Sequence, residues 1–154
     1  MSGGLRVWRG GPPDLDAAAG LFQGYLGFYG KSHPVDSARS FIEARLRNGD
    51  SRIFLAALGD RAVGFMQLYP AFASLSLAPS WILNDLFVDS SVRGQGVGEA
   101  LMQAARELAV DTSAAEIFLQ TARDNDSAQR LYRRLGYQRD DEFLVYTLGI
   151  APSP

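Results

Sequence analysis

The stretch that decides the fold is residues 88–107, V-D-S-S-V-R-G-Q-G-V-G-E-A-L-M-Q-A-A-R-E. Gly94, Gly96 and Gly98 fall within five residues, directly after Arg93. The apolar-periodic run that follows predicts a helix over 96–110. Because glycine costs about 1 kcal/mol relative to alanine inside a helix, three glycines at a helix start need a physical reason.

A ligand supplies that reason better than a turn does. The first turn of a helix has free backbone N–H groups and a partial positive charge. Glycines there let a ligand approach the backbone closely, and the permanent charge of Arg93 can pair with a phosphate. A tight strand-to-helix turn alone would need one or two glycines. Three glycines and an arginine therefore favour a pyrophosphate cradle.

Two nucleotide-binding patterns fit this stretch poorly. A P-loop ends in Gly-Lys-Ser/Thr, whereas this stretch has Gly98-Glu99-Ala100. The dinucleotide fingerprint G-x-G-x-x-G needs a sixth-position glycine, which here is Glu99. That fingerprint also belongs after the first strand of a parallel βαβ unit, whereas this stretch follows a fourth predicted strand.

Composition excludes several other classes of protein. The 154 residues fit one domain over 1–154, with 47% apolar and 21% charged residues. A net charge of -2 argues against a non-specific nucleic-acid binder. The absence of cysteine and the single His33 exclude disulfides, a thiol nucleophile and a multi-histidine metal site, so no metal is expected. Without an apolar run of membrane-spanning length or a signal-like N-terminus, we expect a cytoplasmic protein and no membrane partner.

Periodicity and turn residues predict a mixed α/β domain. Gly59-Asp60 predicts a tight hairpin, and 10–13 and 78–80 are predicted as loops. We expect strands at 5–9, 52–58, 62–69, 81–88, 116–120 and 143–148. We expect helices from 12–14 to about 29, from Asp36 or Ser37 to 48, at 96–110 and at 125–135. The order is β-α-α-β-β-β-α-β-α-β, with hairpins early and crossovers late.

Two motifs resemble one known family. Residues 93–98, R-G-Q-G-V-G, match R/Q-x-x-G-x-G/A, the acyl-CoA pyrophosphate motif of the GNAT N-acetyltransferases. Residues 125–137, N-D-S-A-Q-R-L-Y-R-R-L-G-Y, resemble that family's second signature, N-x-x-A-x-x-L-Y-x-x-x-G-F/Y. Residues 81–88, W-I-L-N-D-L-F-V, further resemble the branch with diamine, thialysine and Hpa2-like acetyltransferases.

The resemblance implies acetyl-CoA as cosubstrate and a set of residues that hold it. In the family, the strand before the glycine loop splays from its neighbour, and its backbone binds the pantetheine amides. Asn125 and Ser127 would reach the pantetheine arm, although an N-cap role alone is sufficient for Asn125. The other implied CoA-binding residues are Leu86, Phe87, Val88, Arg93, Gly94, Gln95, Gly96, Val97, Gly98 and Glu99. Such enzymes are often homodimers, and the apolar 143–148 could pack across a two-fold axis.

Tyr132 matches the family's tyrosine that protonates the departing CoA thiolate. From the residues alone, Ala128, Leu131, Tyr132 and Leu135 form one apolar helical stripe, which is typical of a core tyrosine. A tyrosine with a pKa of about 10 is protonated at neutral pH, whereas a thiol titrates near 8.5. Tyr132 therefore suits hydrogen bonding to a developing thiolate.

The nucleophile is expected to be an amine, and the proton acceptor is the open question. A lysine-like amine has a pKa of about 10.4, so freeing it at pH 7 costs roughly 5 kcal/mol. The related branch carries an acid on the fourth strand, where this chain has Asn84 followed by Asp85. Adjacent strand residues face opposite sides, so both cannot enter one pocket without a bulge. Asp85 is the candidate base, a structural carboxylate being the equal alternative. Asn84 is a candidate pocket residue, which could instead order a water that relays the proton.

The acceptor pocket is the least defined part of the prediction. Tyr25 and Tyr29, in Y-L-G-F-Y-G, match the region that borders it in the family, although such a cluster is more often core. We predict an acetyl-CoA-dependent N-acetyltransferase acting by direct attack in a ternary complex. The expected acceptor is a small amine such as a polyamine or an amino-acid derivative. The alternatives are a protein lysine or N-terminal acetyltransferase and a non-catalytic acyl-CoA-binding module.

Overall fold

The computed structural model describes residues 3–151, which form two compact units that divide after Gln120. The first unit contains eight of the helices and strands: β1 (Leu5–Arg9), α1 (Leu15–Phe28), α2 (Val35–Asn48), β2 (Arg52–Leu58), β3 (Arg61–Ala73), β4 (Ala78–Val88), α3 (Val97–Asp111) and β5 (Ile117–Leu119). Its three short 3-10 turns are Pro12–Asp14, Ser74–Ser76 and Ser90–Val92. The second unit contains α4 (Asp126–Arg134).

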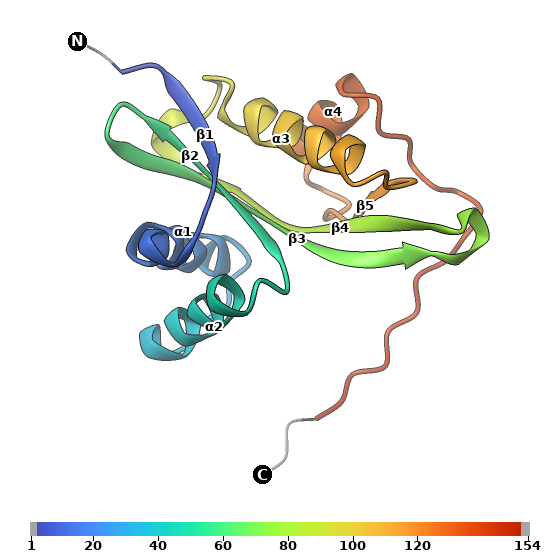
Figure 1. Cartoon of the computed structure of the whole chain (residues 1–154), viewed down its shortest axis with the longest axis horizontal. Coiled ribbons are helices and arrows are strands. Elements are labelled where there is room, and N and C mark those ends of the chain that lie inside the picture. The colour runs from blue at the N-terminus through green and yellow to red at the C-terminus, as the bar shows by residue number, and fades with distance from the viewer. Residues whose placement is uncertain (1–2, 152–154) are drawn as a thin grey trace. The chain divides into compact units, whose positions relative to one another are not determined.

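The first unit is built on one mixed sheet with strand order β1-β2-β3-β4-β5 (Figure 1). Strands β1 to β4 are antiparallel neighbours, and β4 pairs with β5 in parallel. Gly59 takes a φ of 61° in the β2–β3 hairpin, as the Gly59-Asp60 pair predicts. The loop predicted at 78–80 is instead strand, because these residues continue the ladder opposite 71–73 on β3.

Helices cover both faces of this sheet (Figure 1). Helices α1 and α2 pack on one face, where their buried residues meet those of β2 and β3 in a cluster of Ala18, Leu21, Phe22, Ala38, Ile42, Ile53, Leu55 and Phe65. The other face is covered by α3, whose buried stripe is Val97, Leu101, Met102 and Ala105. The predicted α3 is confirmed to within one residue at each end, since its apolar period alone defines the buried face.

One irregularity in the sheet determines which side chains meet at the candidate active site. Gln67 on β3 pairs with Asp85 on β4, but the next residue, Leu68, pairs with Leu83. Asn84 is therefore an extra residue on β4, which makes a β-bulge. Because of the bulge, Leu83 lies on the α3 face of the sheet and Asp85 lies on the α1 face, although the two are only two residues apart.

The second unit contains one short helix and an extended tail. The Asn125 Oδ1 accepts a hydrogen bond from the Ala128 N at 3.3 Å, which confirms Asn125 as the N-cap of α4. Gly136 follows the helix with a φ of 94°, a left-handed conformation that ends many helices at glycine.

Two sequence predictions need correction. The strand predicted at 143–148 is not formed, since these residues have no ladder partner within 3–151 and Phe143, Leu144 and Tyr146 are exposed. An apolar run becomes a strand only where a neighbouring edge pairs with its backbone. Helix α2 begins at Val35 after Pro34, one or two residues before the predicted caps Asp36 and Ser37. Within residues 3–151, no helix is both long and apolar enough to cross a membrane.

Two glycines of α1 give a matched test of the α1–sheet contact. A Cβ at Gly24 would lie 2.7 Å from ring atoms of Phe87, whereas a Cβ at Gly20 would meet nothing within 4 Å. We expect Gly24→Ala to lower the free energy of unfolding by about 1–3 kcal/mol through overpacking. Gly20→Ala should raise it by about 0.5–1 kcal/mol, because alanine loses less backbone entropy on folding. Urea denaturation measures both, and equal effects of the two substitutions would contradict the contact.

Candidate active site

The backbone edge of β4 opens beyond its bulge. Strand β4 keeps its ladder with β3 as far as Val88, but it pairs with β5 only over the three residues 81–83. On the β5 side, the backbone of residues 84–88 therefore has no strand partner within the described chain. Leu86, Phe87 and Val88 lie in this part of β4, and their role in binding CoA stays a prediction. Backbone N–H and C=O groups left open in this way are ready to bind a ligand.

The glycine loop, residues 93–98, follows this open edge and leads into α3. Gly94 and Gly96 have φ angles of 79° and 82°, a left-handed conformation that glycine adopts without steric cost. An added Cβ would meet nothing within 4 Å at either position, so the loop is also open to a ligand. Buried Val92 and Val97 anchor the two ends of the loop. The turn thus requires two of the three glycines, and the space around both is free.

The start of α3 can hold an anion. Its N-cap, Gly96, has no side chain to bond the first N–H groups of the helix, which include those of Gly98 and Glu99. The exposed Arg93 lies at the loop, with its guanidinium carbon 5.7 Å from the centre of the Phe28 ring. Gln95 is also exposed in this loop. The backbone N–H groups of a helix N-terminus and a guanidinium are the features that bind phosphate groups.

Asp89 holds the beginning of the loop, and sequence reasoning missed it. Its carboxylate accepts hydrogen bonds from the Ser91 N at 2.9 Å and the Ser91 Oγ at 2.8 Å, and it pairs with Arg61 at 2.9 Å. The bonds from the Ser91 N–H and hydroxyl, and then the charge of Arg61, lower the pKa of Asp89. The signal was the D-S-S sequence after a strand, because aspartate readily bonds the backbone two residues on.

A chain of buried polar side chains lies on the α1 face beside the bulge. Asp85 is only 3% exposed, and its carboxylate accepts hydrogen bonds from the Gln67 Nε2 at 2.6 Å and the Asn84 Nδ2 at 2.9 Å. The Gln67 Oε1 in turn accepts from the Ser51 Oγ at 2.7 Å. The bulge therefore brings Asn84 and Asp85 together, which a regular strand would not allow. Gln67 and Ser51 were missed, because their contact with β4 depends on strand register.

Tyrosines from α1 and β3 adjoin the same carboxylate. The Tyr25 hydroxyl donates to the Asn84 carbonyl oxygen at 3.2 Å, and the Tyr29 ring packs edge-on to Tyr25 at 5.1 Å. Burial raises the pKa of Tyr25, and the charge and hydrogen bond of Asp85 raise it further. Burial and the charge of Asp85 raise the pKa of Tyr69 to about 12. Of the predicted pocket residues, Tyr25 and Asn84 thus adjoin Asp85, and Tyr29 packs on Tyr25.

The second unit holds the remaining predicted residues. The Tyr132 ring lies 6.0 Å from that of Tyr137, and the Tyr132 carbonyl accepts from the Tyr137 N at 2.9 Å. Asn125 caps α4, and Ser127 is exposed in its first turn. The assignment of Asn125, Ser127 and Tyr132 to the site stays a prediction, as does the single domain over 1–154.

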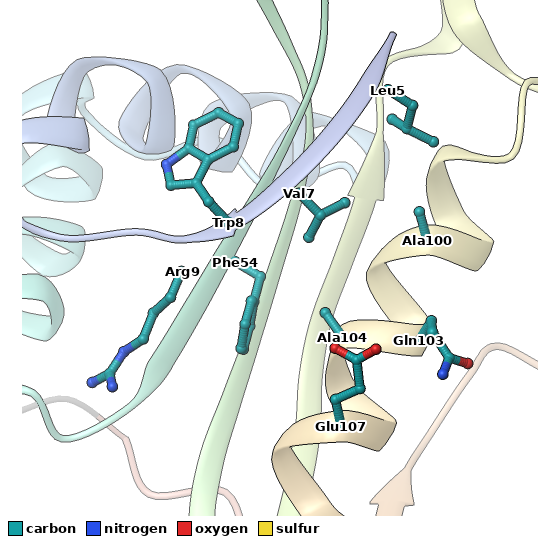
Figure 2. A pocket seen from close by; sticks show the side chains of 9 residues that line it. All are labelled: Leu5, Val7, Trp8, Arg9, Phe54, Ala100, Gln103, Ala104 and Glu107. Carbon is teal, nitrogen blue, oxygen red and sulfur yellow. The ribbon is translucent and has the colours of Figure 1, made fainter. Parts of the chain in front are cut away.

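A separate hollow of about 460 Å³ lies between β1 and α3 (Figure 2). Leu5, Val7 and Ala100 line it, and Arg9 and Glu107 lie at its margins. None of the residues predicted for the site belongs to this hollow. The candidate active site is therefore the open edge of β4 with the glycine loop and the Asp85 cluster. This cluster consists of Asp85, Asn84, Gln67, Ser51 and Tyr25.

Residues 18–137 match the model of the Acetyltransferase (GNAT) family. The chain belongs to this family. It is therefore an acetyl-CoA-dependent N-acetyltransferase, which confirms the prediction from the two motifs.

Individual relatives agree with this assignment. The chain is 39% identical over 137 residues to YhfO of Bacillus subtilis, described as an uncharacterized N-acetyltransferase, and the match covers 89% of this chain and 92% of YhfO. It is 27% identical to HPA3 of Saccharomyces cerevisiae, a D-amino-acid N-acetyltransferase, over 84% of this chain and 82% of HPA3. The crystal structure of a probable acetyltransferase superposes with a TM-score of 0.88 and 42% identity, over 96% of this chain and 99% of that one.

The electrostatic link between Asp85 and the tyrosines predicts the alkaline titration. Because folding raises the pKa of Tyr25 and Tyr69, their contribution to stability is fully present below the ordinary tyrosine pKa of about 10. That contribution is lost as pH rises through the folded-state pKa values. We expect Asp85→Asn to move the late tyrosinate absorbance to lower pH, since it removes a negative charge. Asp111→Asn, at the exposed end of α3, is the control, and identical titrations of the two variants would contradict the link.

Proposed function

We propose that this enzyme acetylates a primary amine of a small molecule by direct attack in a ternary complex with acetyl-CoA. The observation that carries the proposal is the open edge of β4, which begins at the Asp85 cluster and ends at the glycine loop. One stretch of chain thus joins a proton acceptor to a phosphate cradle. The similarity to HPA3, whose named acceptors are D-amino acids, supports a small amine and the resemblance to the Hpa2-like branch.

The first unit supplies most of the contacts to acetyl-CoA in this proposal. The open backbone of Leu86 to Val88 bonds the pantetheine amides. The glycine loop and the first turn of α3 surround the pyrophosphate, and Arg93 pairs with its charge. Asn125 and Ser127 of the second unit contact the pantetheine arm, as the family resemblance implies.

The chemistry needs one proton removed and one supplied. The acceptor arrives as an ammonium and must lose a proton before its nitrogen can attack the thioester carbonyl carbon. Asp85 is the proposed proton acceptor, because it is the carboxylate beside the open edge. When the carbon–sulfur bond breaks, the Tyr132 hydroxyl donates a hydrogen bond to the sulfur that leaves. Asn84, Tyr25 and Tyr29 border the acceptor.

Acetylation of a panel of amines by the purified protein tests this proposal. The panel holds polyamines, amino acids of both configurations, and peptides with a free N-terminus or a lysine, and released CoA thiol is measured. Turnover with small amines and none with peptides is the expected result. Turnover with peptides alone would favour the protein acetyltransferase instead. No turnover with any amine would contradict the proposal.

The homodimer and the cytoplasmic location remain predictions. The exposed apolar residues of 143–148 are the surface that a second copy would cover. A monomer in light scattering would contradict the dimer.

Arg93 is the charged part of the proposed cradle. We expect Arg93→Ala to weaken acetyl-CoA binding by about 10-fold to 100-fold, the loss typical of a charge-assisted contact. Arg106→Ala removes the same charge from an exposed site further along α3 and should leave the affinity unchanged. Titration calorimetry measures both dissociation constants. Equal affinities of the Arg93 variant and the wild type would remove Arg93 from the cradle.

Removing only the hydroxyl of Tyr132 distinguishes a catalytic tyrosine from a core tyrosine. We expect Tyr132→Phe to lower kcat by about 10-fold to 1000-fold, because the ring stays but the thiolate loses its donor. The affinity for acetyl-CoA should be nearly unchanged. Steady-state kinetics with the best amine of the panel measures this effect. A wild-type kcat would return Tyr132 to a purely structural role.

A further inference from the structure

Asp85 cannot meet the acceptor amine directly. Its side chain is nearly fully buried, and three neutral groups surround its carboxylate: the Gln67 amide, the Asn84 amide and the Tyr25 hydroxyl. No cation pairs with it within residues 3–151. A buried carboxylate without a cation attracts an ammonium, but it needs an intermediate group to exchange a proton with one.

Tyr25 is the group that occupies this intermediate position. It lies on α1 and is half-buried, and its hydroxyl donates to the Asn84 carbonyl oxygen at 3.2 Å, beside the Asp85 carboxylate, whose charge acts on it. Its ring is held between Phe22, at 6.0 Å, and Tyr29, at 5.1 Å. A hydroxyl oxygen carries one hydrogen and two lone pairs, so Tyr25 can accept a proton from an amine while it donates its own.

We propose that the Tyr25 hydroxyl relays the proton of the acceptor ammonium to the Asp85 carboxylate. An N–H bond of the ammonium breaks as an O–H bond forms on the Tyr25 Oη, and its electron pair stays on nitrogen. For this transfer the Tyr25 hydroxyl turns its hydrogen from the Asn84 carbonyl oxygen to the Asp85 carboxylate. The original Tyr25 O–H bond then breaks as a new O–H bond forms on Asp85. Tyr25 ends as a neutral hydroxyl, Asp85 as a carboxylic acid, and the amine as a free nucleophile. This relay rests on the proposed function and identifies how its proton leaves.

The surroundings of Tyr25 suit a relay better than a base. Burial and Asp85 raise its pKa, so the phenol stays protonated throughout the working pH range and cannot act as a free phenolate. A relay needs that protonated state, because its own hydrogen must be present to move on. Since Tyr25 never carries a net charge in the step, the transfer needs no separated phenolate beside Asp85.

Gln67 and Ser51 hold the receiving carboxylate in place. Gln67 is fully buried, and the hydroxyl that Ser51 donates to its Oε1 fixes which end of the amide faces Asp85. The Gln67 Nε2 is thereby directed at the Asp85 Oδ2 at 2.6 Å. The amide keeps one oxygen of Asp85 bonded, and the carboxylate is oriented without a competing positive charge.

The other ionisable groups near Asp85 define the control. Tyr25 faces it from α1, with Tyr29 beside Tyr25, and Tyr69 faces it from β3. Arg45 and Asp50, paired at 2.9 Å, lie near Tyr69. Asp85 acts on Tyr69 through its charge, whereas the Tyr25 hydroxyl is also bonded to the backbone of Asn84, next to Asp85. Tyr69→Phe therefore removes a comparable half-buried hydroxyl without touching the relay.

The test compares Tyr25→Phe with Tyr69→Phe over a range of pH, with an alkylamine as acceptor. We expect Tyr25→Phe to lower kcat/KM at neutral pH by about 100-fold, the low end of general acid–base contributions. The loss should shrink as pH approaches the pKa of the amine, because the acceptor is then neutral without help. With a weakly basic amine that is neutral at the assay pH, the loss should nearly vanish. Tyr69→Phe should keep the wild-type profile, and calorimetry should show unchanged acetyl-CoA affinity for both variants.

A double-mutant cycle separates the relay from a packing role. Tyr25 and Asp85 serve one proton path, so Tyr25→Phe in an Asp85→Asn background should cause little further loss. Multiplied losses in the double variant, or a wild-type pH profile in Tyr25→Phe, would overturn the relay while the acetyltransferase proposal stands. Failure of the wild type to acetylate any amine would overturn both. Thermal melting of each variant confirms that it is folded.

Discussion

The extra residue in β4 is the constraint on which the site depends. A regular strand would place Leu83 and Asp85 on the same face. Either the apolar Leu83 would then lie in the polar cluster, or the carboxylate of Asp85 would lie among apolar side chains. With Asn84 as a bulge, Leu83 is buried beside α3 and Asp85 is buried beside α1. Pairing with β5 ends at Leu83, the residue just before the bulge. The same distortion therefore turns a carboxylate toward Tyr25 and opens the edge of β4.

This arrangement is costly for stability. A buried carboxylate loses its hydration, and neutral hydrogen-bond donors replace that hydration only in part. An apolar side chain at position 85 would pack beside Phe87 and Phe65 without that loss. Gln67 and Ser51 are likewise buried polar groups whose bonds are directed at one acceptor. In this chain of polar side chains, each hydrogen bond depends on the others, and the chain lies inside an apolar core. Such an arrangement is typical of a site that is retained for its chemistry.

The parts of the site that the sequence predicts are the local ones. The positive φ angles of Gly94 and Gly96, the cap of α4 at Asn125 and the apolar stripe of α3 each depend on neighbours within a few residues. The bulge is not local, because W-I-L-N-D-L-F-V does not reveal which residue is left over when β4 pairs with β3. Gln67 meets Asp85 across 18 residues, and Ser51 meets Gln67 across 16, so register alone brings them together. The strand predicted at 143–148 failed for the same reason, since its pattern could not supply a ladder partner.

In the proposed mechanism, binding of the cosubstrate and transfer of the proton take place at different ends of the segment 85–88 of β4. The glycine loop follows one end of this segment, and Asp85 lies at the other. At about 3.3 Å per residue, Asp85 and Val88 are roughly 10 Å apart along β4, and the glycine loop lies further still. A cosubstrate that reaches both ends must be long, with its reacting group near the tyrosines and its charge at the helix N-terminus. Contacts made with the remote phosphates are the same before and during the reaction, so they hold the cosubstrate without selecting the transition state. The rate then depends on the few groups around Asp85, whose geometry the bulge fixes.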